Sequence, residues 1–210
     1  MNLEQQKHIK AEDAALVERW RRGDISAIER LAGKYQGRIY NLILKICANP
    51  DTAAELTQDT FVKIIENIDR FESRSSFYTW AFRIAVNLTL NYCKRKTAVR
   101  WTSLDAEAAG HQGIRVSGYQ DESAGATLAA ILRDEKSPDP SQVAENRELC
   151  RLVQIALGKL EEEQRTIVVL RDIEGMDYAQ IAEVLAVELG TVKSRLSRAR
   201  AVLRQLLEAL

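Results

Sequence analysis

The spacing of apolar residues is the feature that most restricts the fold of this 210-residue chain. From Asp13 to about Val99 apolar residues recur every three or four positions, which is typical of helices buried on one face. Turn signals divide this stretch at residues 22–24, 49–51 and 72–75. Helical spacing returns at Glu145 and continues to the C-terminus. Because no segment alternates like a strand, the sequence predicts an all-α fold.

The periodic stretches are separated by residues 101–144, which are rich in Gly, Ser, Asp and Glu and include the proline-containing segment Ser137–Pro140. Each proline disfavours helix in the residue before it, and the composition is that of a linker. We therefore predict two small helical domains joined by a flexible acidic linker. The expected bounds are an N-terminal extension over 1–12, a first domain over 13–99, a linker over 100–146 and a second domain over 147–210.

Net charge is zero, with 30 basic and 30 acidic residues, and taken alone this argues against a nucleic-acid partner. The charge is unevenly distributed, however. Residues 1–100 carry 17 basic and 12 acidic groups, residues 101–150 carry 4 and 9, and residues 151–210 carry 9 of each. The acidic excess therefore falls in the linker, between two helical domains that retain basic faces.

Catalysis, metal binding and cofactor binding have no support in the sequence. Cys47, Cys93 and Cys150 are far apart and have no histidine beside them, so buried free thiols are the favoured interpretation. His8 and His111 fall in segments expected to be flexible, and no phosphate-binding glycine loop occurs. No apolar run reaches the roughly 20 residues that span a bilayer, so we expect a cytoplasmic protein without membrane insertion.

The C-terminal domain has the pattern of a helix-turn-helix. Gly175 is expected to end a helix over 161–174, and Asp177 to cap a short helix, Tyr178–Leu185. After a tight turn, the last helix has a single apolar stripe. The stripe comprises Val192, Leu196, Ala199, Leu203 and Leu206.

The opposite face of the last helix is basic, with no acid between Thr191 and Gln205. A helix of this kind suits a major groove, where arginine and serine read base edges and other cations hold phosphates. A solvated surface is the alternative, which the lack of acids four residues away disfavours. The predicted base-reading residues are Lys193, Ser194, Ser197 and Arg198. The predicted phosphate contacts are Arg195, Arg200 and Arg204.

The helix expected over 52–70 has a mixed outer face. Its predicted inner residues are Ala54, Phe61, Ile64, Ile65 and Ile68, and its predicted outer residues are Glu55, Asp59, Val62, Lys63 and Glu66. Such a face is either solvated or bound by a partner protein, and periodicity does not separate the two.

The helix expected over 77–96 has a more informative exposed side. Its predicted buried stripe is Phe77, Trp80, Ala81, Ile84, Leu88 and Tyr92, and its far side carries Arg83, Asn87, Leu90 and Lys94. A basic helix beside an aromatic loop is typical of single-stranded DNA binding, because bases stack and cations follow the backbone. Phe77 and Trp80 are expected in the core, whereas Phe71 and Tyr78 are left open between core and base contact.

Three motifs resemble the bacterial extracytoplasmic-function sigma factors of the sigma-70 family. Residues 54–61 (AELTQDTF) resemble the helix that binds core polymerase. Residues 75–80 (SSFYTW) and 83–87 (RIAVN) resemble the promoter-reading part of region 2. Residues 190–195 (GTVKSR) with 198–200 (RAR) resemble the recognition helix of region 4. This order of motifs across a linker is far more specific than a lone helix-turn-helix.

The resemblance implies a sigma factor that binds core RNA polymerase, recognises minus-10 and minus-35 elements and assists strand opening. The implied polymerase contacts are the clamp of the largest subunit and the flap of the second-largest subunit. The core-binding residues would be Glu55, Gln58, Asp59, Val62 and Lys63. The minus-10 residues would be Phe71, Ser73, Arg74, Ser75, Ser76, Tyr78, Arg83, Asn87 and Lys94. In the last helix, the residues that read the minus-35 element would be Lys193, Ser194, Ser197 and Arg198. Its phosphate contacts would be Arg195, Arg200 and Arg204.

Other expectations also follow from the resemblance. Promoter DNA is a partner, an anti-sigma factor is plausible, and the protein is expected to be a monomer. Two departures stand out: the loop at 71–74 reads FESR where Phe-Arg-Gly-Glu is common, and Ala186 stands where glycine is frequent. A positive φ at Ala186 would cost up to about 1 kcal/mol.

Glu188 is unusual so close to phosphates: its charge favours the helix dipole but repels DNA. The alternative function is a free-standing helix-turn-helix regulator that binds duplex DNA as a dimer. The sequence favours the sigma factor because it has no ligand domain and no evident dimer helix.

Overall fold

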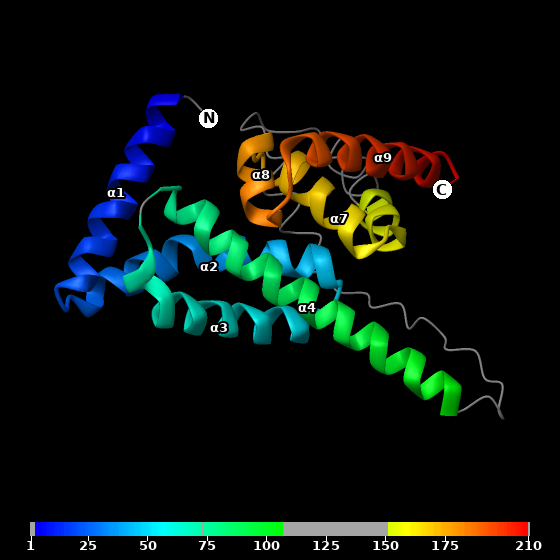
Figure 1. Ribbon diagram of the computed structural model, residues 1–210, viewed down its shortest axis with the longest axis horizontal. Coiled ribbons are helices and arrows are strands. Elements are labelled where there is room, and N and C mark those ends of the chain that lie inside the picture. Colours follow the sequence, from blue (N-terminus) through cyan, green and yellow to red (C-terminus); the bar gives the residue numbers. More distant parts are fainter. Residues whose placement is uncertain (1–2, 73, 107–150, 210) are drawn as a thin grey trace, which may run out of the picture.

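The computed structural model describes residues 3–72, 74–106 and 151–209 (Figure 1). Within these ranges every regular element is a helix, which confirms the predicted all-α class. None of the helices described there is both long and apolar enough to cross a membrane.

Residues 3–106 form the N-terminal lobe. Its elements are α1 (Leu3–Arg21), α2 (Ile25–Cys47), α3 (Pro50–Asn67), the 3-10 turn η1 (Ile68–Arg70) and α4 (Phe77–Ala106). Side chains cap two of these helices: Asp24 accepts from the Ser26 amide, and Asn49 accepts from the Thr52 amide. α1 begins inside the predicted extension over 1–12, and α4 ends inside the predicted linker over 100–146.

The core of the N-terminal lobe departs from the predicted stripes on α3 and α4. On α4, Phe82, Ala85 and Val86 are fully buried, whereas Trp80, Ile84 and Leu88 are half-buried. α4 contacts α2 and α3 and also α8, so it buries more than one face. On α3, the expectation that Ala54 and Ile65 are buried was wrong, because both are exposed.

Residues 151–209 form the C-terminal lobe. After a helix over 151–159 come α7 (Glu162–Val168), the π-helical turn η2 (Val169–Ile173), α8 (Tyr178–Leu185) and α9 (Leu189–Glu208). Gly175 follows η2 with φ +70°, and Asp177 caps α8 as predicted. The cap is a capping box, in which the Gln180 side chain also accepts from the Asp177 amide. Ala186 has φ +53°, so alanine occupies a left-handed position between α8 and α9.

The two lobes pack against each other, a feature absent from the sequence expectations. α8 lies on α4, and α7 and η2 contact α2 (Figure 1). The Arg165 side chain on α7 is buried and donates to the carbonyls of Leu157, Gly158 and Leu160 within its own lobe. Its Nη1 donates to the Ile46 carbonyl of α2 at 2.6 Å. One guanidinium therefore satisfies carbonyls at the ends of helices in both lobes.

Candidate nucleic-acid interface

The helix-turn-helix presents the predicted face of α9 to solvent. Val192, Leu196 and Ala199 are buried against the rest of the C-terminal lobe. The four predicted base-reading residues, Lys193, Ser194, Ser197 and Arg198, are all exposed. This arrangement suits a helix that enters a major groove with one face while the other is packed.

The flanks of α9 are partly paired with acids of the same lobe. Arg195 Nη1 lies 3.4 Å from a carboxylate oxygen of Glu163, and Arg200 makes a two-point contact with Asp172. These side chains remain exposed, and exposed pairs contribute only about 0–1 kcal/mol each. Glu188 occupies the N-cap position of α9, and its side chain makes no capping bond.

A groove of about 360 Å³ runs between the end of α3 and the first half of α4. α3 and η1 contribute Lys63, Asn67 and Arg70, and α4 contributes Trp80, Arg83, Ile84, Asn87, Leu88 and Asn91. The structure thus brings the predicted Arg83 and Asn87 together. The sequence reasoning missed Asn67, Arg70 and Asn91, although Asn91 lies one helical turn after Asn87.

The loop before α4 has buried ends and an exposed middle. The Phe71 ring is 4 % exposed and contacts Phe77 and Trp80, with centroids 6.0 and 5.2 Å apart. Ser76 Oγ accepts from the Thr79 amide at 3.0 Å, in the first turn of α4. Arg74 and Ser75, both predicted minus-10 residues, lie between these points, and Ser73 lies outside the described residues.

Tyr78, the other aromatic left open by the sequence, lies on the side of α4 that faces the C-terminal lobe. The Arg38 guanidinium stacks over its ring at 4.4 Å, and its hydroxyl lies 3.5 Å from Glu174. Burial raises the pKa of the Tyr78 phenol, so it stays protonated. Neither Tyr78 nor Phe71 presents a free ring for base stacking in this conformation.

The outer face of α3 carries the predicted polymerase-binding residues Glu55, Gln58, Asp59, Val62 and Lys63, all of them exposed. Val62 is 51 % exposed and Ile65 is 44 % exposed, so two large apolar side chains lie within a charged face. Apolar side chains ringed by polar groups are typical of protein-binding surfaces. The exposed Ile65 adds to the partner interpretation that the sequence left open.

A cluster of charges joins the lobes around Glu174, whose side chain is 7 % exposed. Arg38 lies 3.3 Å from Glu174, and the Lys45 amine lies 3.9 Å from it. The Lys45 amine is buried and has no hydrogen-bond partner within the described ranges. Burial lowers the pKa of Lys45, and the nearby Glu174 carboxylate partly opposes that shift.

Part of the predicted minus-10 surface lies close to one predicted phosphate contact of α9 across the lobe contact. A cavity of about 170 Å³ is lined by Asn87, Leu90, Asn91 and Lys94 of α4 and by Glu163, Thr166, Leu185 and Arg195 of the C-terminal lobe. Glu163 lies 3.8 Å from Lys94 and 3.4 Å from Arg195. One carboxylate therefore lies near a predicted minus-10 cation and a predicted minus-35 cation.

Metal-ligating groups do not cluster in the ranges that the structure describes. Cys47 and Cys93 form no disulfide, and burial raises the pKa of both thiols. Cys150 and His111 lie outside the described residues.

Two family models match the chain, one for each lobe. The model for Sigma-70 region 2 matches residues 31–99, and the model for Sigma-70, region 4 matches residues 150–203. The ECF RNA polymerase sigma-E factor of Haemophilus influenzae is 31 % identical over 198 residues, covering 94 % of this chain and 96 % of that protein. The ECF RNA polymerase sigma factor SigW of Bacillus subtilis is 31 % identical over 194 residues, covering 92 % of this chain and 96 % of that protein.

Solved structures share the fold. CnrH in complex with the cytosolic domain of CnrY matches with a TM-score of 0.61 and 24 % identity, covering 94 % of this chain and 98 % of that chain. The sigma factor RpoE in complex with the anti-sigma factor NepR from Bartonella quintana matches with a TM-score of 0.59 and 23 % identity, covering 88 % and 98 %. At this identity the likeness establishes the all-helical architecture of both lobes together.

Proposed function

This chain belongs to the extracytoplasmic-function group of sigma-70-family RNA polymerase sigma factors, and from that membership we propose which surfaces perform each step of promoter recognition. The protein directs promoter-specific transcription initiation by RNA polymerase. Sigma factors act by binding, and the roles proposed below for individual residues need no catalytic group or cofactor.

The outer face of α3 docks on the clamp of the polymerase's largest subunit. Glu55, Gln58, Asp59 and Lys63 supply charge and hydrogen bonds, and Val62 supplies apolar contact. Exposed apolar side chains inside a polar ring support this role, because the buried centre of an interface is depleted in charge. The C-terminal lobe docks on the flap of the second-largest subunit.

The groove between α3 and α4 receives the opened minus-10 strand. Arg83 and Lys94 neutralise phosphates, and Asn87 pairs with the edge of an unstacked base held by the loop at 71–76. The half-buried Trp80 in the groove offers an apolar surface for a base. Capture of an unpaired base offsets the unstacking cost of a few kcal/mol.

α9 reads the minus-35 element in its major groove. Lys193, Ser194, Ser197 and Arg198 face base edges, and Arg195, Arg200 and Arg204 hold phosphates and fix the register. The exposure of the four reading residues opposite a buried stripe supports this assignment.

The lobes separate when the promoter binds. The two elements are about 25 base pairs apart, which corresponds to roughly 85 Å of duplex. In the structure two predicted minus-10 residues, Asn87 and Lys94, line one cavity of about 170 Å³ together with Arg195, a predicted minus-35 phosphate contact. A single conformation of this kind cannot contact both elements, so the conformation described here is a closed one that core polymerase opens.

The protein is a cytoplasmic monomer in its free state, and an anti-sigma factor is among its partners. Support for the anti-sigma factor comes from relatives of this fold, since one solved sigma factor is described in complex with the anti-sigma factor NepR.

Reconstitution with core polymerase tests the proposed function. The single observation that carries it is the presence of both reading faces in one chain, each matched by its own family model. Purified protein should bind promoter DNA weakly alone and support specific run-off transcription with core enzyme. A protein that neither binds core nor supports transcription, or that footprints its target unaided, would contradict the assignment.

A further inference from the structure

Arg21, the last residue of α1, forms hydrogen bonds to the backbone of residues 68–71. This segment leads into the loop at 71–76, which is called the minus-10 loop below. Its Nη2 lies 3.2 Å from the Ile68 carbonyl and 3.2 Å from the Asp69 carbonyl, and it also donates to the Phe71 carbonyl. Its Nη1 donates to Glu18 of the same helix at 2.6 Å. The three carbonyls lie in and just after η1, where backbone oxygens carry partial negative charge, and the Ile68 carbonyl also accepts from the Phe71 amide at 3.1 Å.

The loop is consequently fixed at both ends. At one end, Arg21 donates a hydrogen bond to the Phe71 carbonyl, and the Phe71 ring is buried in the core. At the other end, Ser76 bonds to the first turn of α4. Between these ends, the side chains of Glu72 and Arg74 are 64 % and 88 % exposed and form an ion pair with each other at 2.8 Å.

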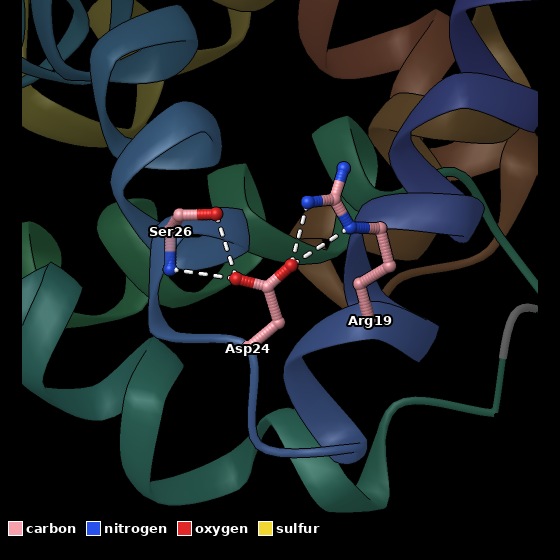
Figure 2. A network of polar contacts seen from close by, with 3 residues as sticks. All are labelled: Arg19, Asp24 and Ser26. Carbon is pink, nitrogen blue, oxygen red and sulfur yellow. Dashed lines mark hydrogen bonds and ion pairs between the residues drawn. The ribbon is translucent and has the colours of Figure 1, made fainter.

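α1 is itself held rigidly against α2, so Arg21 does not depend on a loose helix end. Figure 2 shows the turn between the two helices: Arg19 donates to Asp24 at 2.9 and 2.6 Å, and Asp24 also accepts from the amide and hydroxyl of Ser26. Earlier in α1, the buried Asp13 carboxylate accepts hydrogen bonds from Lys34 and Tyr35 of α2.

We propose that Arg21 is a positioning residue for minus-10 recognition, acting from α1 through the carbonyls of Ile68, Asp69 and Phe71. It lies outside the region 2 match over 31–99. A base-capturing loop must be held close to its bound geometry before the base arrives, because ordering it afterwards reduces affinity. This inference rests on the proposed minus-10 role of the loop.

The test compares Arg21→Ala and Arg21→Lys with wild type in reconstituted polymerase. The matched control is Arg22→Ala, which removes the same charge from the neighbouring exposed residue. Run-off transcription is measured on promoters substituted one base at a time in the minus-10 and in the minus-35 element, together with core affinity and the thermal unfolding midpoint.

Arg21→Ala should lower the preference for the captured minus-10 base about fivefold or more, the effect of losing one discriminating base contact. Minus-35 selectivity and core affinity should stay within about twofold of the wild-type values, as expected for sites distant from Arg21. Arg21→Lys should restore much of the preference, because an ammonium keeps the positive charge and has three donors for these carbonyls. Arg22→Ala should behave as wild type.

Three results would overturn the inference: unchanged minus-10 selectivity in Arg21→Ala, a proportional loss of minus-10, minus-35 and core binding together, or the same selectivity loss in Arg22→Ala. Asn87→Ala separates this failure from failure of the proposed function. If Asn87→Ala changes minus-10 preference and Arg21→Ala does not, only the positioning role is wrong. If neither changes it, the minus-10 assignment itself is wrong.

Discussion

Replacing Glu174 by glutamine removes the anion that faces the buried amine of Lys45 across the lobe contact. Glu174 is 3.3 Å from Arg38 and 3.9 Å from Lys45, and its side chain is 7 % exposed. Breaking a buried ion pair by removing one partner typically costs about 3–5 kcal/mol, because the other charge is left uncompensated. The closed conformation should therefore lose about 3 kcal/mol, or roughly 150-fold in its ratio to open forms.

The cost falls on the lobe contact because the partners of the Glu174 side chain among the described residues, Arg38, Lys45 and Tyr78, belong to the other lobe. When the lobes separate, Lys45 returns to water. The substitution therefore lowers the free energy of association between the two lobes and leaves the stability of each lobe unchanged. If core polymerase binds the open form, as proposed above, a chain that is already open should bind core more tightly, since apparent affinity scales with the fraction competent to bind. Glu174→Gln should increase both the radius of gyration and core affinity.

Small-angle X-ray scattering and a core-binding titration measure these two effects. Glu161→Gln is the matched control, because Glu161 is an exposed acid of the same lobe whose side chain makes no capping bond. Far-UV circular dichroism checks that both lobes remain helical. A Glu174→Gln protein with wild-type dimensions and wild-type core affinity would refute the claim that this charge cluster holds the lobes together.

Four further substitutions test the stability of the turn before α9 and the proposed sites. Ala186→Gly should raise the free energy of unfolding by up to about 1 kcal/mol in urea titration, because φ is +53° there; a loss of stability would contradict this. Arg198→Ala should cost about 1–3 kcal/mol at one minus-35 base pair, whereas Arg204→Ala should weaken all sequences evenly; uniform effects from both in binding assays would mean that the reading face is misplaced. Asn87→Ala should alter minus-10 preference in run-off transcription while core binding is kept, and unchanged selectivity would count against its role.

Local patterns predicted part of the C-terminal lobe, although Leu203 and Leu206 of the expected stripe are half-buried and the helix expected over 161–174 is divided into α7 and η2. The buried Val192, Leu196 and Ala199 follow from spacing alone, and the Asp177 cap follows from its place before an apolar run. Both depend on residues within one or two helical turns, which is the range over which sequence spacing determines which side chains are neighbours. The exposed basic face of α9 then follows from the buried one.

α4 shows where such patterns fail. The buried residues include Phe82 and Val86 rather than Ile84 and Leu88, because α4 packs on α2 and α3 and also on α8. A helix with more than one buried face has no single apolar stripe to find. The contacts of Arg165 with Ile46 and of Glu174 with Arg38 join residues more than 100 positions apart, and no local signal marks such pairs.

The zero net charge of the chain is compatible with the proposed DNA binding because three cations of the proposed DNA-contact surfaces, Lys94, Arg195 and Arg200, are paired with acids of the chain itself. Glu163 lies beside both Lys94 and Arg195, and Asp172 holds Arg200. Each of these exposed pairs is worth about 0–1 kcal/mol, whereas every phosphate contact also releases condensed counterions. On the proposed function, DNA replaces these acids at small cost. Parting of the lobes separates the Lys94–Glu163 pair, whereas the Arg195–Glu163 and Arg200–Asp172 pairs lie within the C-terminal lobe and yield to phosphates there.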